Sequence, residues 1–326
     1  MPAFSPKSCW VISEGAAGME NQALGLAERL GLPVTIKRVR LAKRWGWMAP
    51  RLPVSPFGRE ARGTDRLTPP WPRIAIGCGR QSIPFMLAIK KASPQTLIVQ
   101  CQHPRIDPAR FDLVLPPLHD GLIGANVLPL VGSPNRITTE RLEKARKPAA
   151  IRFAHLRKPI LTVLVGGKSA AYRFTAAAGA ELGHALASLA QTHGLIVLPS
   201  RRTGAQTHAQ ISNALAGSDA FIWDRSGDNP YLGALALADA FLVTSDSVNM
   251  ACEAAATGKP VHIFALPGGT AKFNRFHASL EAKGITRPFT GKIEQWRYAP
   301  LDETGRATTQ IRALLDLSGQ PTDMNL

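Results

Sequence analysis

The chain is poor in acidic residues and in cysteine. Its 326 residues carry 23 Asp and Glu against 39 Lys and Arg, a formal net charge of +16. This imbalance favours anionic partners, which include nucleotides, nucleic acids and an acidic membrane surface. The four cysteines form no C-x-x-C pair and lie in apolar surroundings, at Cys9, Cys78, Cys101 and Cys252. We expect reduced core residues of a cytoplasmic protein.

Long hydrophobic runs are also lacking. The first 15 residues, MPAFSPKSCWVISEG, do not contain the apolar stretch of a signal peptide, and no run of about 18 apolar residues is long enough to span a bilayer. We therefore expect a cytoplasmic protein whose membrane contact, where it exists, is peripheral and on the inner face of the cytoplasmic membrane.

Several signatures of common nucleotide and metal chemistry are missing. Thr162 stands where a Walker A motif needs its first glycine, which argues against ATP hydrolysis. None of the three tyrosines has a lysine four residues on, as a nucleotide-sugar epimerase or dehydrogenase of the Tyr-x-x-x-Lys type requires. There is no Asp-x-Asp tripeptide and no His/Cys cluster, so the sequence gives no case for a required metal or other cofactor.

What the chain does contain is a regular alternation of short β-rich apolar runs with helical patterns, which is typical of parallel sheets covered by helices. The predicted fold class is α/β, with two Rossmann-like domains facing across a cleft. The predicted strands are 10–13, 34–39, 74–77, 96–100, 113–115, 127–130, 160–165, 195–199, 220–223, 241–244 and 261–265. The predicted helices are 20–30, 82–91, 138–146, 176–192, 205–215, 231–238, 248–257, 272–282 and 302–317.

The expected domains are residues 1–150 and 151–326. The basic segment 143–159 contains two prolines and no clear strand pattern, and this favours an interdomain linker. The stretch 41–72 interrupts the alternation as an irregular insertion rich in Pro, Arg and Trp.

The segment 244–264 (TSDSVNMACEAAATGKPVHIF) is the most informative part of the chain. A strand ends in hydroxyl and carboxylate groups, and a helix begins at once. Asp246, Asn249 and Glu253 are spaced so that a helix places them on one face, and the free N–H groups around Ser247 can hold an anion. The alternative is a Ser/Asp-capped helix that only packs.

Three other predicted strands of the second half also end in polar or glycine-rich groups. Since the carboxyl ends of parallel strands meet at one edge of a sheet, where open α/β sheets bind ligands, these groups are expected to converge. We predict a nucleotide-phosphate site formed by Gly167, Lys168, Ser169, Arg201, Arg202, Asn229, Ser245, Asp246, Ser247, Asn249 and Glu253. For each residue taken alone, a structural turn or cap is the competing interpretation.

The first half offers a glycine-containing loop after its first strand, EGAAGMENQ, and several candidates for a general base. Glu14 and Asp120 are the preferred candidates, His119 and Asp120 are expected to pair as base and orienter, and His103 is a further candidate. A solvated His-Asp turn is the competing interpretation of residues 119–120.

Taken together, EGAAGMENQ, VGGKSAAYRF, SRRTG, GDNPYLGALALADAFLVTSDSVNMACEAAATGKPV and KFNRFHASLEAKGITRPF resemble the bacterial branch of the mitochondrial fission ELM family. This family looks like a divergent GT-B glycosyltransferase group. The resemblance implies two Rossmann-like domains, a nucleotide-sugar held mainly by the second, and a last helix that crosses back to the first. It also implies that Glu253 binds the ribose hydroxyls, while the N–H groups of 247–249, with Gly167, Lys168 and Arg201, meet the diphosphate.

The function that these observations favour is a glycosyltransferase with a UDP- or GDP-sugar donor and a lipid-linked or glycan acceptor. Two alternatives remain: a non-catalytic scaffold on an anionic membrane surface, and a nucleoside-diphosphate-sugar epimerase. Sequence-specific nucleic-acid binding is not expected, because no recognition module is visible. The stretch 43–51 (KRWGWMAPR) mixes basic and aromatic residues as an interfacial docking loop does, unless Trp45 and Trp47 pack against the first domain.

Overall fold

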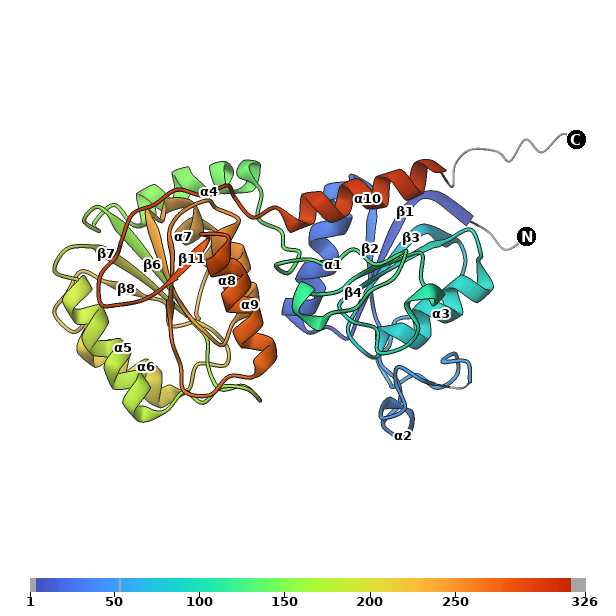
Figure 1. The fold of residues 1–326 in the computed structure, drawn as a ribbon, viewed down its shortest axis with the longest axis horizontal. Coiled ribbons are helices and arrows are strands. Elements are labelled where there is room, and N and C mark those ends of the chain that lie inside the picture. Colours follow the sequence, from blue (N-terminus) through green and yellow to red (C-terminus); the bar gives the residue numbers. More distant parts are fainter. Residues whose placement is uncertain (1–3, 53, 318–326) are drawn as a thin grey trace, which may run out of the picture. The chain divides into compact units, whose positions relative to one another are not determined.

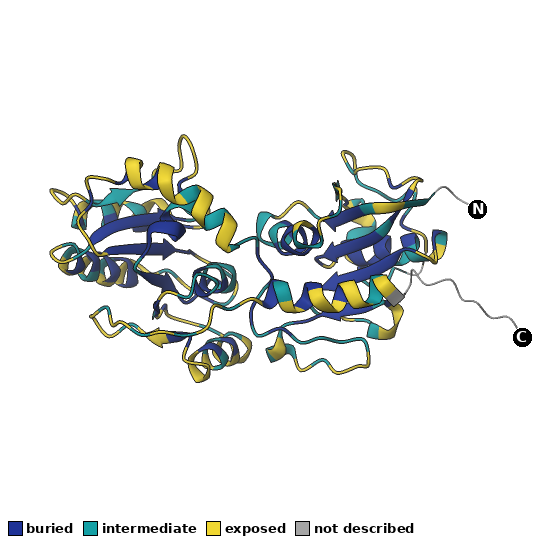
Figure 2. Ribbon diagram, turned by 90° about the horizontal axis from the view of Figure 1, so that it is seen from above, coloured by how far each residue is buried: buried dark blue, intermediate teal, exposed yellow. Residues whose placement is uncertain are grey.

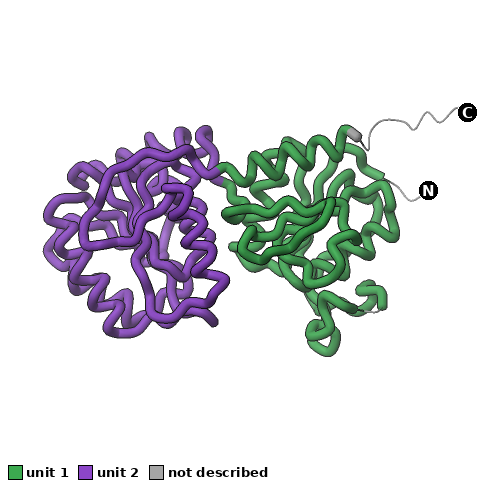
Figure 3. Tube along the Cα trace, viewed as in Figure 1, with its two compact units in different colours: residues 1–136, 302–326 green, residues 137–301 purple. Residues whose placement is uncertain are grey.

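The computed structural model describes residues 4–52 and 54–317 and divides into two compact units. The first unit comprises residues 1–136 together with 302–326, and the second comprises 137–301 (Figure 3). The division falls after Arg136, whereas we expected it near residue 150. None of the described helices is long and apolar enough to cross a membrane.

A five-stranded parallel sheet forms the centre of the first unit, in the order β2-β1-β3-β4-β5 (Figure 1). One face packs on α1 and α10 through a core that includes Leu26 and Ile311, and the other face packs on α3 through Phe85 and Met86. The strands are β1 (Phe4–Ser13), β2 (Val34–Arg38), β3 (Trp71–Cys78), β4 (Leu97–Cys101) and β5 (Leu113–Leu115). The helical elements are α1 (Ala17–Leu30), α2 (Lys43–Gly46), α3 (Ser82–Ala92), the 3-10 turns η1 (Pro108–Arg110) and η2 (Leu118–Asp120), and α10 (Glu303–Leu317).

Helix α10 is the last described element of the chain, yet it packs in the first unit. Thr304 exchanges hydrogen bonds with the backbone of Asn135, at 2.9 and 3.0 Å. The Glu303 carboxylate accepts the N–H of Val131 at 3.0 Å, and Arg29 pairs with Asp302 at 2.6 Å. These polar contacts flank the apolar seam between α10 and α1, so the C-terminal helix completes the first core.

A six-stranded parallel sheet forms the second unit, in the order β11-β10-β9-β6-β7-β8. Most residues of its strands are apolar because both faces are covered, and Figure 2 shows the strands buried while the outer helix faces are exposed. The strands are β6 (Ile160–Val165), β7 (Gly194–Pro199), β8 (Phe221–Ile222), β9 (Ala240–Thr244), β10 (Val261–Phe264) and β11 (Thr286–Pro288). The helices are α4 (Thr139–Arg152), α5 (Ala176–Leu189), α6 (Ala205–Ala214), α7 (Tyr231–Leu237), α8 (Val248–Ala255) and α9 (Ala271–Ala282).

The α/β class with two Rossmann-like parallel sheets is confirmed, but the segment predicted as a linker is not a linker. Residues 139–152 form α4, with Pro148 inside the helix. This helix packs on α7 so closely that a Cβ on Gly233 would lie 2.8 Å from the Cβ of Ala149. That tertiary contact outweighs the hydrogen bond lost at the proline.

The strand predicted at 127–130 is also wrong. Val127 and Leu130 pair with β5 and its extension only as isolated bridges, to Val114 and Pro117. Prolines 116, 117 and 129 interrupt this ladder because proline has no N–H to donate. The predicted irregular insertion does contain one regular element, the single-turn helix α2.

Gly25 of α1 gives a test of the packing in the first unit. A Cβ at this position would lie 2.2 Å from the carbonyl oxygen of Asn135, so Gly25→Ala must displace backbone. We expect the free energy of unfolding to fall by about 2 kcal/mol, measured by denaturant unfolding. Gly46→Ala is the matched control: it is helical, and the nearest atoms to its Cβ are 3.8 and 3.9 Å away, so its stability should not fall.

Candidate functional site

The second sheet has a topological switch point between β6 and β9. The chain runs outward from β6 to β7 and β8 on one side, and from β9 to β10 and β11 on the other. Loops leave a switch point in opposite directions, which opens a crevice at the carboxyl ends of the two strands. The residues that follow β6, β7 and β9 are the predicted site residues, so the sheet brings these three groups to one edge.

The centre of this edge is the carboxylate of Asp246, whose side chain is fully buried. It accepts the N–H of Gly167 at 2.9 Å and the hydroxyl of Thr244 at 2.7 Å. It also pairs with the guanidinium of Arg202 at 2.8 Å. Three strand ends are therefore joined through one charged group.

The glycines at 166 and 167 are required by close approach rather than by backbone conformation. A Cβ on Gly166 would lie 2.1 Å from the Asp246 carboxylate, and one on Gly167 would lie 2.0 Å from the carbonyl oxygen of Arg202. The hydroxyl of Thr203 bridges the same loops, because it donates toward the carbonyls of Val165 and Gly166.

These contacts correct part of the sequence prediction. The N–H of Gly167, which we expected to meet a phosphate, is taken by Asp246. Asp246 itself precedes α8 and turns its carboxylate toward the neighbouring loops, so it does not share a helix face with Asn249 and Glu253. Ser169 accepts the N–H groups of Ala171 and Tyr172 and so closes a tight turn.

The start of α8 lies next to this carboxylate. Ser247 is the N-cap, and its hydroxyl accepts the N–H of Met250 at 3.4 Å. Ser245 is structural: its hydroxyl accepts the N–H of Leu266, while its carbonyl meets the ring of His277 at 2.8 Å. Asn249 and Glu253, four residues apart, both lie on α8 and are partly buried.

Glu253 is hydrogen-bonded by the hydroxyl of Tyr231, the first residue of α7. Burial raises the pKa of the Glu253 carboxyl to about 7, and the Tyr231 bond opposes that rise. Burial and the adjacent carboxylate also raise the pKa of Tyr231 well above its usual value. A carboxyl group that changes charge near neutral pH, next to a phenol, is typical of functional sites.

Two cations at this edge form no ion pair within the described part of the chain. Lys168 and Arg201 are exposed, and neither side chain forms an ion pair with any residue in 4–52 or 54–317. Asn229, by contrast, is used in the fold, because its side-chain oxygen accepts the N–H of Tyr231 at 3.0 Å. This is the capping role that competed with the binding role in the sequence.

In the first unit the candidate bases occupy different loops. The Glu14 carboxylate accepts the backbone N–H of Gln81 at 3.1 Å and its side-chain amide at 3.3 Å, and so it holds the loop before α3. His119 and Asp120 lie on η2. His103 accepts the N–H of Arg105 through Nδ1 at 2.9 Å. The pairing of His119 with Asp120 as base and orienter stays a prediction.

The sequence prediction missed the buried charge of the first unit. Glu20, in the first turn of α1, forms a two-point ion pair with Arg38, whose Nε and Nη2 each lie 2.9 Å from a carboxylate oxygen. It also accepts the hydroxyl of Ser13 at 3.1 Å. The hydrogen bond from Arg38 lowers the pKa of Glu20 most. The signal in the sequence was Ser13 at the end of a buried strand, followed seven residues later by Glu20 at the start of a helix.

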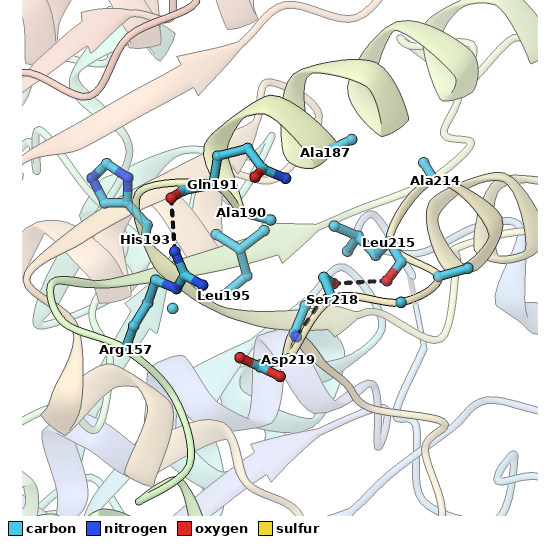
Figure 4. Close-up of a pocket in the computed structure, with 14 residues that line it drawn as sticks. Arg157, Ala187, Ala190, Gln191, His193, Leu195, Ala214, Leu215, Ser218 and Asp219 are labelled. Carbon is cyan, nitrogen blue, oxygen red and sulfur yellow. Dashed lines mark hydrogen bonds between the residues drawn. The ribbon is translucent and has the colours of Figure 1, made fainter.

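A cavity of about 220 Å³ lies at the opposite edge of the second sheet (Figure 4). It is bounded by the ends of α5 and α6 and the start of β7, and it includes Arg157, His193 and Asp219. None of the predicted site residues lines it. Within the described part of the chain, no group of three or more His, Cys, Asp or Glu side chains is placed to hold a metal ion.

Comparison with known proteins identifies the family. The family described as "Mitochondrial fission ELM1" matches residues 17–315. The Mitochondrial fission protein ELM1 of Arabidopsis thaliana is 33% identical over 277 residues, 76% of this chain and 65% of the plant protein. This chain thus matches slightly less than two thirds of that relative's length. Uncharacterized protein RP120 of Rickettsia prowazekii (strain Madrid E) is 26% identical over 356 residues, 95% of this chain and 99% of that protein.

Among solved structures, UDP-GlcNAc 2-epimerase from Methanocaldococcus jannaschii, in complex with UDP-GlcNAc and UDP, has a TM-score of 0.55. It is 11% identical, and the match covers 94% of this chain and 99% of that one. At this identity the likeness shows the fold alone, which is of the GT-B-like type. The resemblance found in the sequence motifs is confirmed by the family match over residues 17–315: the chain belongs to the mitochondrial fission ELM1 family.

Proposed function

We propose that this protein is a glycosyltransferase that binds a nucleoside-diphosphate sugar at the carboxyl edge of its second sheet. The observation that carries the proposal is the switch point between β6 and β9, where Lys168 and Arg201 are exposed and form no ion pair within the described residues. Their neighbours Gly167 and Arg202 contact Asp246, which precedes α8. A diphosphate leaving group develops negative charge in the transition state. Fixed cations and a helix N-terminus stabilise that charge.

The residues of α8 supply the second part of the donor site. In the proposal, the N–H groups of Val248 and Asn249 meet the diphosphate, and Glu253 accepts hydroxyl groups of the ribose. Glu253 lies between one and two turns along the helix from Ser247, which is about 9 Å at 1.5 Å per residue. This distance along α8 is similar to the distance between the diphosphate and the ribose hydroxyls of a nucleotide.

Arg202 has a different role in the proposal. The Arg202 side chain is 43% exposed although the side chain of its partner, Asp246, is fully buried, so Arg202 reaches from the interior contact to the surface. A bound phosphate would share this arginine with Asp246. The Asp246 carboxylate, held by Gly167 and Thr244, keeps the three loops together and is assigned no contact with the donor.

The donor class is taken from the fold neighbour with UDP-GlcNAc and UDP bound. We carry over only the chemical class, a uridine diphosphate sugar, and place it at the second unit's edge. A GDP-sugar is the other member of the class. A lipid-linked or glycan acceptor is part of the same proposal.

A nucleoside-diphosphate-sugar epimerase is the second candidate, because the fold neighbour is a UDP-GlcNAc 2-epimerase. Both activities begin with the same bound donor but give different products. Incubation with UDP-GlcNAc and chromatography of the nucleotide fraction separates them. Release of UDP supports transfer or slow hydrolysis, whereas an isomeric UDP-sugar with no UDP released supports the epimerase.

The first test is ligand-induced stabilisation. Thermal unfolding of the wild type is measured with UDP, GDP, CMP, ADP and NAD, and a ligand at about 100 times its Kd should add about 2.7 kcal/mol. We expect a shift with UDP or GDP. Arg201→Ala should reduce this shift because it removes a charge-assisted contact worth about 1.5–3 kcal/mol.

The matched control for Arg201→Ala is Arg297→Ala. Arg297 is also exposed, but it adjoins Tyr298, whose hydroxyl donates to the carbonyl of Lys259 just before β10 begins, at the opposite edge of the sheet. Its nucleotide shift should equal that of the wild type. A wild type that responds to no nucleotide, or an Arg297 variant that loses as much as the Arg201 variant, would contradict the proposed site.

Glu253 gives a test that depends on pH. Its carboxyl pKa is raised from 4.5 to about 7 in the folded chain, so the folded state holds this proton longer than the unfolded state. The associated stability is complete below pH 4.5 and is lost as pH rises through about 7. Relative to Glu253→Gln, the wild type should lose about 3 kcal/mol of stability across this range.

The measurement is a series of unfolding curves for the two proteins across the range, with their difference plotted against pH. Tyr231→Phe is the companion variant, because removing its hydroxyl removes the hydrogen bond that favours the Glu253 carboxylate. Its loss of stability should continue to higher pH. A difference that does not change with pH would show that Glu253 titrates normally.

A further inference from the structure

The insertion between β2 and β3 is a folded projection of the first unit. Residues 41–52 and 54–70 leave the sheet and return to it, with α2 lying away from the strands (Figure 1). Its base is fixed: Leu41 and Glu60 form a bridge, and Ala42 donates to the carbonyl of Arg59 at 2.8 Å. Arg80, in the loop after β3, donates to three carbonyls of the projection, those of Gly46, Trp47 and Ala49.

The two tryptophans of α2 and its C-cap have opposite environments. Trp45 packs against the core of the first unit, and the guanidinium groups of Arg44 and Arg59 lie 5.7 and 5.2 Å from its ring. Trp47 is 73% exposed, although its indole N–H is held by the carbonyl of Arg44 at 3.0 Å. The competing interpretation, in which both rings pack against the first domain, therefore holds for Trp45 and not for Trp47.

Basic side chains outnumber acidic ones in the projection. Residues 41–70 contain six basic side chains and two acidic ones. None of the six forms an ion pair with any residue that the structure describes: Lys43, Arg44, Arg51, Arg59, Arg62 and Arg66. Trp47 has helical backbone angles and follows Lys43 by four residues, so the exposed ring and this lysine lie on one side of α2.

We propose that this projection docks the first unit on the surface of an anionic lipid bilayer. Trp47 enters the headgroup region with its apolar ring, while its N–H stays bonded to the carbonyl of Arg44. Lys43, Arg51, Arg62 and Arg66 lie against lipid phosphates. Val54 is a second exposed apolar side chain of the projection, 40% exposed. A nucleic acid also stacks its bases on exposed indole rings, so the vesicle experiment below is the measurement that separates it from a bilayer.

The position of the projection has a consequence for the unit that carries it. Arg80 holds the projection, and the next residue, Gln81, donates its backbone N–H to Glu14. Gln81 also accepts the N–H of Leu41 at 3.0 Å. The proposed docking surface is thus linked to the carboxyl edge of the first sheet through Arg80 and Gln81, and Gln81 in turn contacts Glu14.

The test is co-sedimentation of the full chain with vesicles of phosphatidylcholine alone and of phosphatidylcholine mixed with phosphatidylglycerol. We expect binding to the mixed vesicles only, weakening as salt is added. Lys43→Gln/Arg51→Gln should lower the affinity about 25-fold, since each basic side chain near an anionic surface is worth about fivefold. Lys144→Gln/Lys147→Gln on α4 removes two exposed charges elsewhere and should bind as the wild type does.

Trp47→Phe separates insertion from charge attraction. Fluorescence quenching by lipids brominated on the acyl chain should fall in this variant relative to the wild type, and Trp47→Ala should weaken vesicle binding. Both proteins should fold normally because the ring is exposed. No binding to mixed vesicles, equal binding to neutral ones, equal loss in the α4 variant, or nucleic-acid binding without vesicle binding would each overturn the proposal.

Discussion

The organisation of the second unit depends on one buried carboxylate. Asp246 carries a charge into a site with no exposed side-chain surface, and such a charge is tolerated only where donors surround it. A backbone N–H, a hydroxyl and a guanidinium do so, and they come from the ends of β6, β9 and β7. The loops that would bind a donor are therefore held in place by an interaction that does not itself need the donor.

Much of this arrangement was predictable from strand ends. A nearly continuous apolar run, such as 160–165, indicates a strand buried on both faces, and the polar residues that follow it mark the ligand edge. Such a pattern does not reveal which polar groups form hydrogen bonds with one another. Asp246 and Gly167 are 79 residues apart, and Tyr231 and Glu253 are 22 apart, so no helical or strand period connects them.

The wrong predictions have physical reasons that lie outside local sequence. Proline and positive charge at 143–159 favour a linker, but contact between Ala149 and Gly233 stabilises a helix there. Residues 127–130 have the composition of a strand, yet three nearby prolines leave too few N–H groups for a ladder. In both places, the secondary structure was determined by residues other than those that favoured the prediction, namely a packing partner in one case and prolines in the other.

The return of α10 to the first unit also constrains how the chain can fold during synthesis. The first 136 residues emerge from the ribosome without Ala307 and Ile311, two buried members of their core. The second unit is continuous from 137 to 301 and contains all its own strands. The core of the first unit is therefore completed only after α10 has been translated. Until then, an apolar surface of its sheet and of α1 stays uncovered. This reverses the usual order, in which N-terminal domains are completed first.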